Sequence, residues 1–173
     1  KAICQFCDTD FWGTDGMNGG KYKTAKDVAK AVKDLWKQNE KGEDLGTPYV
    51  VCTGGEPLLQ LDKKLVKAFH KLGIEVGIET NGTIKAPKNI DWICMSPKAG
   101  ADLVLKKGNE LKLVFPQPSA MPDQFEHLKF DHFYLQPMDG PRAAENTRLT
   151  LEYCLKNPKW NLSIQTHKLL NIP

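Results

Sequence analysis

The chain has 173 residues, of which 40% are hydrophobic, so it can bury one sizeable core and requires no second domain. Its 24 basic and 21 acidic residues give a formal net charge of +3 without a polybasic tract, which indicates neither a nucleic-acid stripe nor a membrane-surface patch. No apolar run approaches the roughly 20 residues that span a bilayer, and five cysteines without a spacing framework favour a reducing compartment, so we expect a cytoplasmic protein.

Short β-rich runs alternate with amphipathic runs along the chain, which is the order of parallel strands joined by crossover helices. Thr24 is suited to cap a first helix that runs to about Asn39. The apolar face expected for this helix consists of Val28, Val32, Leu35 and Trp36. Residues 49–53 follow as a predicted buried strand.

A second helix is expected over residues 62–72, where apolar side chains recur at helical spacing. Gly73 suits the left-handed position just past its end, and residues 74–80 return as a strand. The remaining predicted strands are 92–96, 111–115, 133–136 and 162–166, and the remaining predicted helices lie near 122–128 and 142–156. Several crossovers are too short for a full helix.

Polar residues follow five of the predicted strands. The five exits are 53–56, 79–82, 96–98, 136–139 and 165–167. In parallel α/β folds the carboxyl ends of the strands converge on one face, and that face holds the site. A single exit of this kind is more often a plain turn. Five in succession indicate a shared pocket, and strand-end position alone makes Glu79 and Asn81 candidates to line it.

Two cysteines three positions apart, Cys4 and Cys7, stand near the start of the chain. Such a pair by itself is more often half of a zinc site or a redox pair. A closed zinc site needs four ligands, however, and the four histidines show no ligand spacing. Cys52 and Cys94 lie in apolar runs and Cys154 lies on a predicted helix, so we expect these three thiols to be packed.

The order and spacing of the motifs resemble the 7-carboxy-7-deazaguanine synthase family of the radical S-adenosylmethionine (SAM) superfamily. The motifs that carry the resemblance are Cys4-x-Phe6-Cys7-Asp8-Thr9-Asp10, Cys52-Thr53-Gly54-Gly55-Glu56-Pro57, Ile78-Glu79-Thr80-Asn81-Gly82-Thr83, Ser96-Pro97-Lys98, Gln136-Pro137-Met138-Asp139-Gly140-Pro141 and Gln165-Thr166-His167-Lys168 with the closing Leu170-Asn171-Ile172-Pro173. They extend over essentially the whole chain. The resemblance implies an α/β fold, an incomplete open (β/α) barrel of radical SAM type with abbreviated crossover helices, in which 1–173 is a single domain.

The likeness is to the branch of the superfamily with a long insertion between the first and second cluster cysteines. It implies that the first cluster cysteine precedes Lys1, and the chain is therefore expected to lack its N-terminal segment.

The resemblance also implies the roles of individual residues. Cys4 and Cys7 would hold a 4Fe-4S cluster, and Thr9 would bind Mg²⁺, although Thr9 taken alone is more often a turn residue. The residues implied to bind SAM are Phe6, Cys7, Asp8, Gly55, Ser96, Pro97, Lys98, Gln136, Pro137, Met138 and Asp139. Thr53 and Pro173 would contact the substrate, in addition to the strand-end candidates Glu79 and Asn81. No catalytic side chain is implied, because the radical derives from the cofactor.

The implied activity is that of a radical SAM lyase. One electron from the cluster would cleave SAM to a 5'-deoxyadenosyl radical that takes the hydrogen at carbon 6 of 6-carboxy-5,6,7,8-tetrahydropterin. Ring contraction and loss of ammonia would then give 7-carboxy-7-deazaguanine for 7-deazapurine and queuosine synthesis. The resemblance suggests a homodimer and a flavodoxin-type electron donor. Two alternatives remain at this point: another radical SAM enzyme such as a glycyl-radical activase, and a zinc-stabilised binding module.

Overall fold

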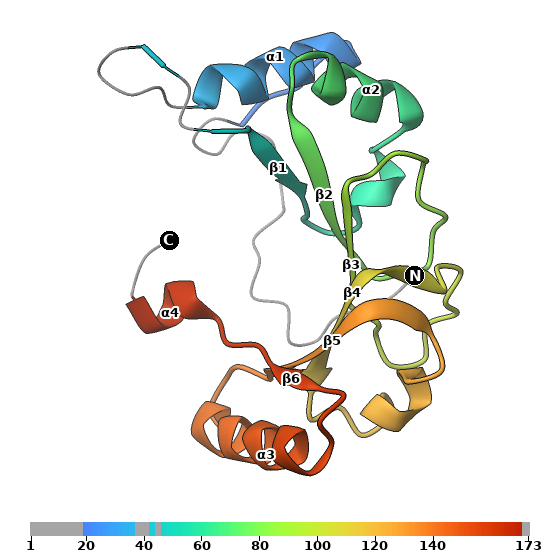
Figure 1. The fold of residues 1–173 in the computed structure, drawn as a ribbon, viewed down its shortest axis with the longest axis vertical. Helices are drawn as coiled ribbons and strands as arrows, with labels where there is room; N and C mark the ends of the chain where they lie inside the picture. The colour runs from blue at the N-terminus through green and yellow to red at the C-terminus, as the bar shows by residue number, and fades with distance from the viewer. Residues whose placement is uncertain (1–18, 37–41, 44–45, 171–173) are drawn as a thin grey trace. The chain divides into compact units, whose positions relative to one another are not determined.

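The computed structural model describes residues 19–36, 42–43 and 46–170. Within this range six strands form one open parallel sheet in the order β1, β2, β3, β4, β5, β6 (Figure 1). Sequential order and parallel pairing are what βα repeats produce, since each connection returns the chain to the same edge of the sheet. The expected incomplete open barrel is therefore confirmed.

The described chain falls into two compact units. The first, here called the N-terminal unit, contains residues 19–79 and 85–93, and the second, the C-terminal unit, contains residues 80–84 and 94–170. In the N-terminal unit α1 (Ala25–Leu35) packs beside α2 (Lys63–Lys71) (Figure 1). Strands β1 (Tyr49–Cys52) and β2 (Glu75–Thr80) pair in parallel, with Tyr49 opposite Glu75.

Helix α1 begins where the sequence predicts and ends four residues earlier than predicted. Thr24 and Asp27 form a reciprocal capping box, with each side chain accepting the other residue's backbone N–H. Trp36 is extended and its N–H bonds to Lys33, which stops the helix after Leu35. The predicted apolar face is also wrong at its end, because Leu35 is 59% exposed and the small Ala29 is the residue buried.

Strand β1 has the predicted position but not the predicted burial. Tyr49 and Val51 are exposed, while Val50 and Cys52 are half-buried. The reason is its place at one end of the strand order, where β2 is its partner among the described strands. One face of an edge strand then meets solvent, and side chains alternate with period two.

Helix α2 follows its sequence signals closely. The Asp62 side chain accepts the Leu65 N–H at 2.8 Å, and Gly73 takes a φ of +71° just past the end of the helix. A short 3₁₀ turn, η1 (Pro57–Leu59), precedes the helix. Val66 and Phe69 are buried against the unit's core together with Val76 and Ile78 of β2.

The C-terminal unit contains the other strands and helices. These elements are the last two residues of β3 (Trp92–Met95), followed by β4 (Lys107–Phe115), η2 (Pro122–Phe125), β5 (Lys129–Pro137), α3 (Ala143–Lys156), β6 (Asn161–Leu162) and α4 (Thr166–Leu170). The connections from β2 to β3 and from β3 to β4 contain no helix, and η2 is a 3₁₀ turn, so the expected abbreviated crossovers are present. Helix α3 packs on β5 and β6, and Leu111, Leu113 and Leu135 are fully buried.

Three predicted boundaries in this unit are wrong. Strands β4 and β5 are nine residues each, longer than predicted, because Lys107 to Glu110 pair with Lys129 to His132, where polar residues interrupt the apolar pattern. The last predicted strand is only two residues long, and Thr166 instead begins α4. The Thr166 N–H bonds to the Ile164 carbonyl, so the chain turns out of the sheet at that point.

Candidate functional site

The exit of β1 supplies the glycine pair in the N-terminal unit. Gly54 has a φ of +118°, and a Cβ built on it would meet no atom within 4 Å. A side chain there would strain the backbone, whereas glycine leaves the backbone open to a close neighbour. Thr53 and Gly55 on either side are exposed, and the Glu56 carboxylate accepts the Leu58 N–H at 3.0 Å, which fixes the turn.

The exit of β2 is a tight turn held by its own side chains. The Asn81 amide oxygen accepts the Thr83 N–H at 3.0 Å and the Thr83 hydroxyl at 2.7 Å. Gly82, with a φ of +79°, offers its carbonyl to the N–H groups of Val104 and Leu105. The turn is therefore fixed within the C-terminal unit. Glu79, one residue before the end of β2, lies in the N-terminal unit.

The exit of β3 places a hydroxyl and an ammonium group together. Lys98 Nζ donates to Ser96 Oγ at 2.7 Å and to the Ser96 carbonyl at 2.9 Å. The Ser96 N–H bonds to the Thr80 carbonyl at 2.8 Å, so this exit lies beside that of β2. Pro97 is buried beneath the half-buried Ser96 and Lys98.

The exit of β5 is fixed by neighbouring elements on several sides. Gln136 and Pro137 are the last residues of β5, so the exit begins within the strand. The Met138 N–H donates to the Phe115 carbonyl of β4 at 2.7 Å, and the Met138 carbonyl accepts from the Asn146 amide of α3 at 2.7 Å. The Asp139 carboxylate forms an ion pair with Lys168 of α4.

The remaining predicted site residues divide into two groups. Thr166 and His167 of the fifth predicted exit belong to α4. The prediction of a strand exit there is therefore wrong, because these residues begin a helix. The others fall outside the described residues: Cys4, Phe6, Cys7, Asp8, Thr9 and Pro173. In the described ranges no cluster of three or more His, Cys, Asp or Glu side chains is arranged to hold a metal ion.

Two of the three cysteines in the described ranges have the character of protonated thiols. Burial raises the pKa of Cys52, and burial also raises the pKa of Cys154. Cys94 is buried, with its Sγ 3.5 Å from Glu110 Oε1. A thiol with a raised pKa is a poor metal ligand, since the thiolate is the ligating form.

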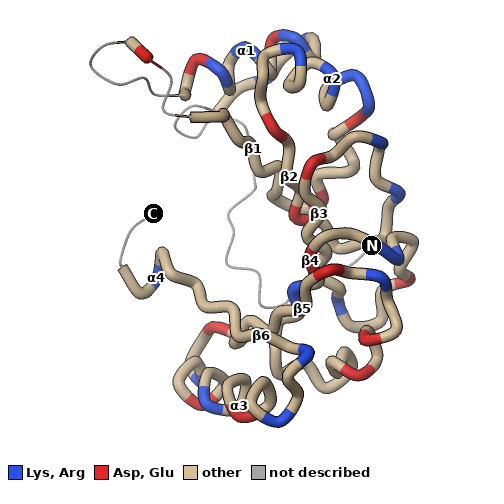
Figure 2. Tube along the Cα trace, viewed as in Figure 1, with Lys and Arg blue, Asp and Glu red and all other residues tan. Residues whose placement is uncertain are grey.

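A separate hollow of about 390 Å³ lies beside α2 in the N-terminal unit. It is lined mainly by Lys63, Lys67 and Lys71 of the helix and by Lys88 of the connection between β2 and β3, and Figure 2 shows the helix lysines in blue. The hollow reaches His70, near the amino end of β2. Its basic lining and its position at that end separate it from the strand exits, so we do not assign it to the site.

The donor chemistry of the exits suits SAM. A serine hydroxyl and a lysine ammonium can bind ribose hydroxyls and a carboxylate, and an exposed glycine backbone can bind the methionine amino group. Sequence reasoning identified each of these exits but missed Asn146, which holds one of them. No sequence signal indicates Asn146, because its burial and its contact depend on how α3 packs against β5.

Comparison with known proteins places the chain in a class. Residues 2–112 match the family described as "Radical SAM superfamily". A solved structure, "Crystal structure of QueE from Escherichia coli", is similar with a TM-score of 0.64 and 26% identity, and the match covers 82% of this chain and 63% of that one. The chain is therefore a radical SAM protein.

The sequence relatives define a narrower family within this superfamily. Proteins named 7-carboxy-7-deazaguanine synthase are 56% identical in Caulobacter vibrioides, 55% in Bradyrhizobium diazoefficiens and 55% in Bordetella pertussis. These alignments cover 99–100% of this chain and 79–80% of each relative. The chain belongs to the 7-carboxy-7-deazaguanine synthase family. This membership decides against a glycyl-radical activase and against a zinc-stabilised binding module.

Among the described residues, no helix is both long enough and apolar enough to cross a membrane.

Proposed function

We propose that this chain catalyses the radical SAM ring contraction of 6-carboxy-5,6,7,8-tetrahydropterin to 7-carboxy-7-deazaguanine with loss of ammonia. The observation that supports this proposal most strongly is the 56% identity to a 7-carboxy-7-deazaguanine synthase over the full length of this chain. The product is the substrate minus one ammonia, so the overall change needs no net oxidant. The reaction serves 7-deazapurine and queuosine synthesis.

The cofactors of this reaction are a 4Fe-4S cluster and SAM, both of which follow from membership of the superfamily. When bound, they supply the electron and the carbon-centred radical that remove a hydrogen atom from the substrate. Cys4 and Cys7 are proposed as cluster ligands, with Phe6 and Asp8 beside SAM. These four residues lie outside the described ranges, so their assignment rests on motif order.

The described residues at the strand exits are proposed to bind SAM and to orient it. Lys98 and Ser96 are proposed to bind SAM as a pair, because the ammonium group already lies 2.7 Å from the hydroxyl and both are half-buried. Gly55 is proposed to offer its backbone to the methionine end, and Pro97 is proposed to contact SAM beside the pair. The β5 exit completes the pocket with Gln136, Pro137, Met138 and Asp139. Such fixed polar groups position the cofactor before reaction and so reduce its entropic cost.

Substrate contacts are proposed at the exits of β1 and β2. Thr53 is exposed directly after β1, and Glu79 is half-buried near the end of β2. Asn81 is held by Thr83 in a defined orientation. Pro173 is retained as a contact from the family resemblance.

Magnesium is proposed at Thr9. A single threonine hydroxyl suffices only where Mg²⁺ keeps waters and takes its other ligands from substrate oxygens. In the proposed complex the substrate would supply those oxygens, and Thr9 would be the protein ligand. Thr9 itself lies outside the described residues.

The assembly, electron donor and compartment are further proposals. We expect a homodimer reduced by a flavodoxin-type protein, on the family resemblance. Cys52, Cys94 and Cys154 of the described ranges are not joined in disulfides, which supports a reducing compartment and makes the cytoplasm the proposed location. Light scattering of the purified protein measures the assembly, and a stable monomer would contradict the dimer.

The function is tested by anaerobic incubation of the reconstituted full-length protein with the tetrahydropterin, reductant, Mg²⁺ and SAM. Mass spectrometry is expected to show 7-carboxy-7-deazaguanine and ammonia in equal amounts. Omission of SAM or reductant should abolish both. Consumption of SAM without formation of the deazaguanine would indicate a different radical SAM reaction and would overturn the proposal.

A further inference from the structure

Asn146 is an unusual residue for its position. It lies one turn into α3 and is 5% exposed, although asparagine is a poor helix former and is seldom buried. A buried amide without a partner costs about 1–3 kcal/mol. Its burial therefore needs a compensating contact.

The compensating contact is made outside the helix. Asn146 Nδ2 donates to the Met138 carbonyl at 2.7 Å, across eight residues of sequence. Side chains in a helix point toward its amino end, which here is the side from which the chain enters from β5. The loop between the two elements is short, and Gly140 turns it with a φ of +117°. Asn146 thus reaches back over its own helix start to the strand exit.

Met138 is held at both of its backbone groups. Its N–H donates to the Phe115 carbonyl of β4 at 2.7 Å, and its carbonyl accepts from Asn146. The following residue, Asp139, is ion-paired with Lys168 of α4. The β5 exit is therefore fixed by three elements of the C-terminal unit, of which α3 contributes a single side chain.

We infer that Asn146 is a positioning residue for the SAM pocket, holding the Met138 carbonyl so that Gln136 to Asp139 keep the orientation in which they meet SAM. The inference rests on the proposed function of that exit. Asn146 touches neither SAM nor substrate in this account. It acts only through the backbone of Met138.

The sharpest variant is Asn146→Asp. It keeps the size of the side chain but replaces the amide donor with an oxygen that faces a carbonyl oxygen. A carboxyl group this buried can bind a proton and donate it to the same carbonyl, so Asn146→Ala, which removes the donor altogether, is measured beside it under the same expectations. The matched control is Thr150→Val, which removes a hydroxyl of equal burial that bonds within α3, to the Asn146 carbonyl at 2.6 Å.

Two measurements on the reconstituted full-length protein test the inference. Hydrogen exchange reports the contact: exchange across residues 136–140 should rise in Asn146→Asp and stay unchanged in Thr150→Val. Equilibrium binding reports its consequence: the Kd for SAM should rise about tenfold in Asn146→Asp, the loss expected for one hydrogen bond, and stay within twofold in the control. Iron and sulfide content should match the wild type in both variants.

The outcomes separate the two claims. Unchanged exchange in Asn146→Asp would show that the amide does not hold the exit. Increased exchange with an unchanged Kd for SAM would show that the exit is not part of the SAM pocket, and either result overturns the inference. Failure of the wild-type protein to bind SAM would instead overturn the proposed function.

Discussion

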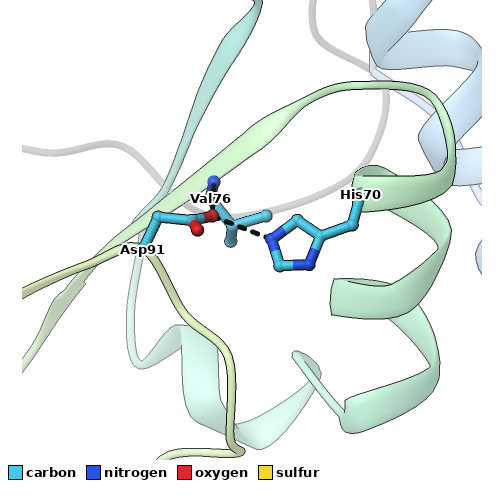
Figure 3. A network of polar contacts seen from close by, with 3 residues as sticks. All are labelled: His70, Val76 and Asp91. Atoms are coloured by element: carbon cyan, nitrogen blue, oxygen red, sulfur yellow. Dashed lines mark hydrogen bonds and ion pairs between the residues drawn. The ribbon is translucent and has the colours of Figure 1, made fainter.

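His70, in the last turn of α2, lies 2.8 Å from Asp91 through its Nε2 atom, although 21 residues separate the two in sequence (Figure 3). The same Asp91 oxygen accepts the Val76 N–H of β2 at 2.7 Å. One carboxylate therefore ties the end of a helix, the start of a strand and the segment before β3 within the N-terminal unit.

The charge of Asp91 is stabilised by these contacts. Burial acts to raise the pKa of its carboxyl, but the hydrogen bonds from Val76 and His70 outweigh it and hold that pKa below its usual value. A carboxyl with a lowered folded-state pKa stabilises the fold above its unfolded-state pKa of about 4, and this contribution is lost as the pH falls through the folded-state pKa.

The first prediction concerns Asp91→Asn. We expect the free energy of unfolding at pH 7 to fall by about 1 kcal/mol, a value discounted because the side chain is 40% exposed. The difference from wild type should shrink as the pH falls below about 4, because the unfolded-state carboxyl binds its proton first, and it should vanish once the pH has fallen through the lowered folded-state pKa. Urea unfolding at pH 7 and pH 3.5 measures this difference in the free energy of unfolding. The exposed Asp131→Asn is the control, and an equal loss in both variants would contradict a specific role for Asp91.

The second prediction concerns the turn after β2. A Cβ added to Gly82 would lie 2.5 Å from the sulfur of Met95 and 2.9 Å from its Cγ, at a φ of +79°. Gly82→Ala should therefore lower the free energy of unfolding by about 2–4 kcal/mol, from overpacking and backbone strain together.

Gly100→Ala separates the two causes. Gly100 has a similar φ of +70°, but an added Cβ would meet no atom within 4 Å. Only the backbone strain applies, so we expect a loss of about 1 kcal/mol by denaturant unfolding. Equal losses at the two glycines would show that Met95 moves aside and that packing around the turn is loose.

The third prediction concerns SAM binding. Lys98→Met keeps the length of the side chain but removes the ammonium group that lies beside Ser96. The Kd for SAM should rise about 10- to 100-fold, since hydrogen bonds to charged groups contribute about 1.5–3 kcal/mol. The exposed Lys106→Met should leave the Kd unchanged. Binding that is equally tight in Lys98→Met would remove this lysine from the pocket.

The fourth prediction concerns magnesium. Thr9→Ala should blunt the dependence of product formation on Mg²⁺ concentration while the iron and sulfide content stays at the wild-type level. The reason is that the hydroxyl is the proposed protein ligand, with the remaining ligands from substrate and water. A magnesium response identical to that of the wild type would exclude Thr9 as the ligand.

Capping residues and a glycine just past a helix end predicted helix boundaries well wherever the sequence contains such signals. Thr24 with Asp27, and Asp62 with Gly73, mark helix ends through contacts within a few residues, and the structure has the ends they indicate. Strand lengths were predicted less well. Lys107 is opposite Lys129 and Glu110 is opposite His132, and such polar pairs are not part of an apolar pattern, so the hydrophobic pattern missed that half of β4 and β5.

In the candidate site, too, features set by local sequence were predictable and contacts between distant elements were not. The exits of β1, β2, β3 and β5 were predictable because glycine and polar residues directly follow apolar runs. The contact of Asn146 with Met138 was not, since it depends on how α3 packs against β5. The exit expected at residues 165–167 was wrong because its polar residues suit a helix start as well as a strand exit.

The central claim is that Cys4 and Cys7 belong to an iron–sulfur cluster that serves SAM chemistry. Its most direct test is the metal and sulfide content of the anaerobically purified full-length protein, measured beside Cys4→Ala and Cys7→Ala. We predict iron and sulfide in equal amounts in the wild type and a loss of both in each variant. Zinc without sulfide in the wild type, released by the same two substitutions, would contradict the account.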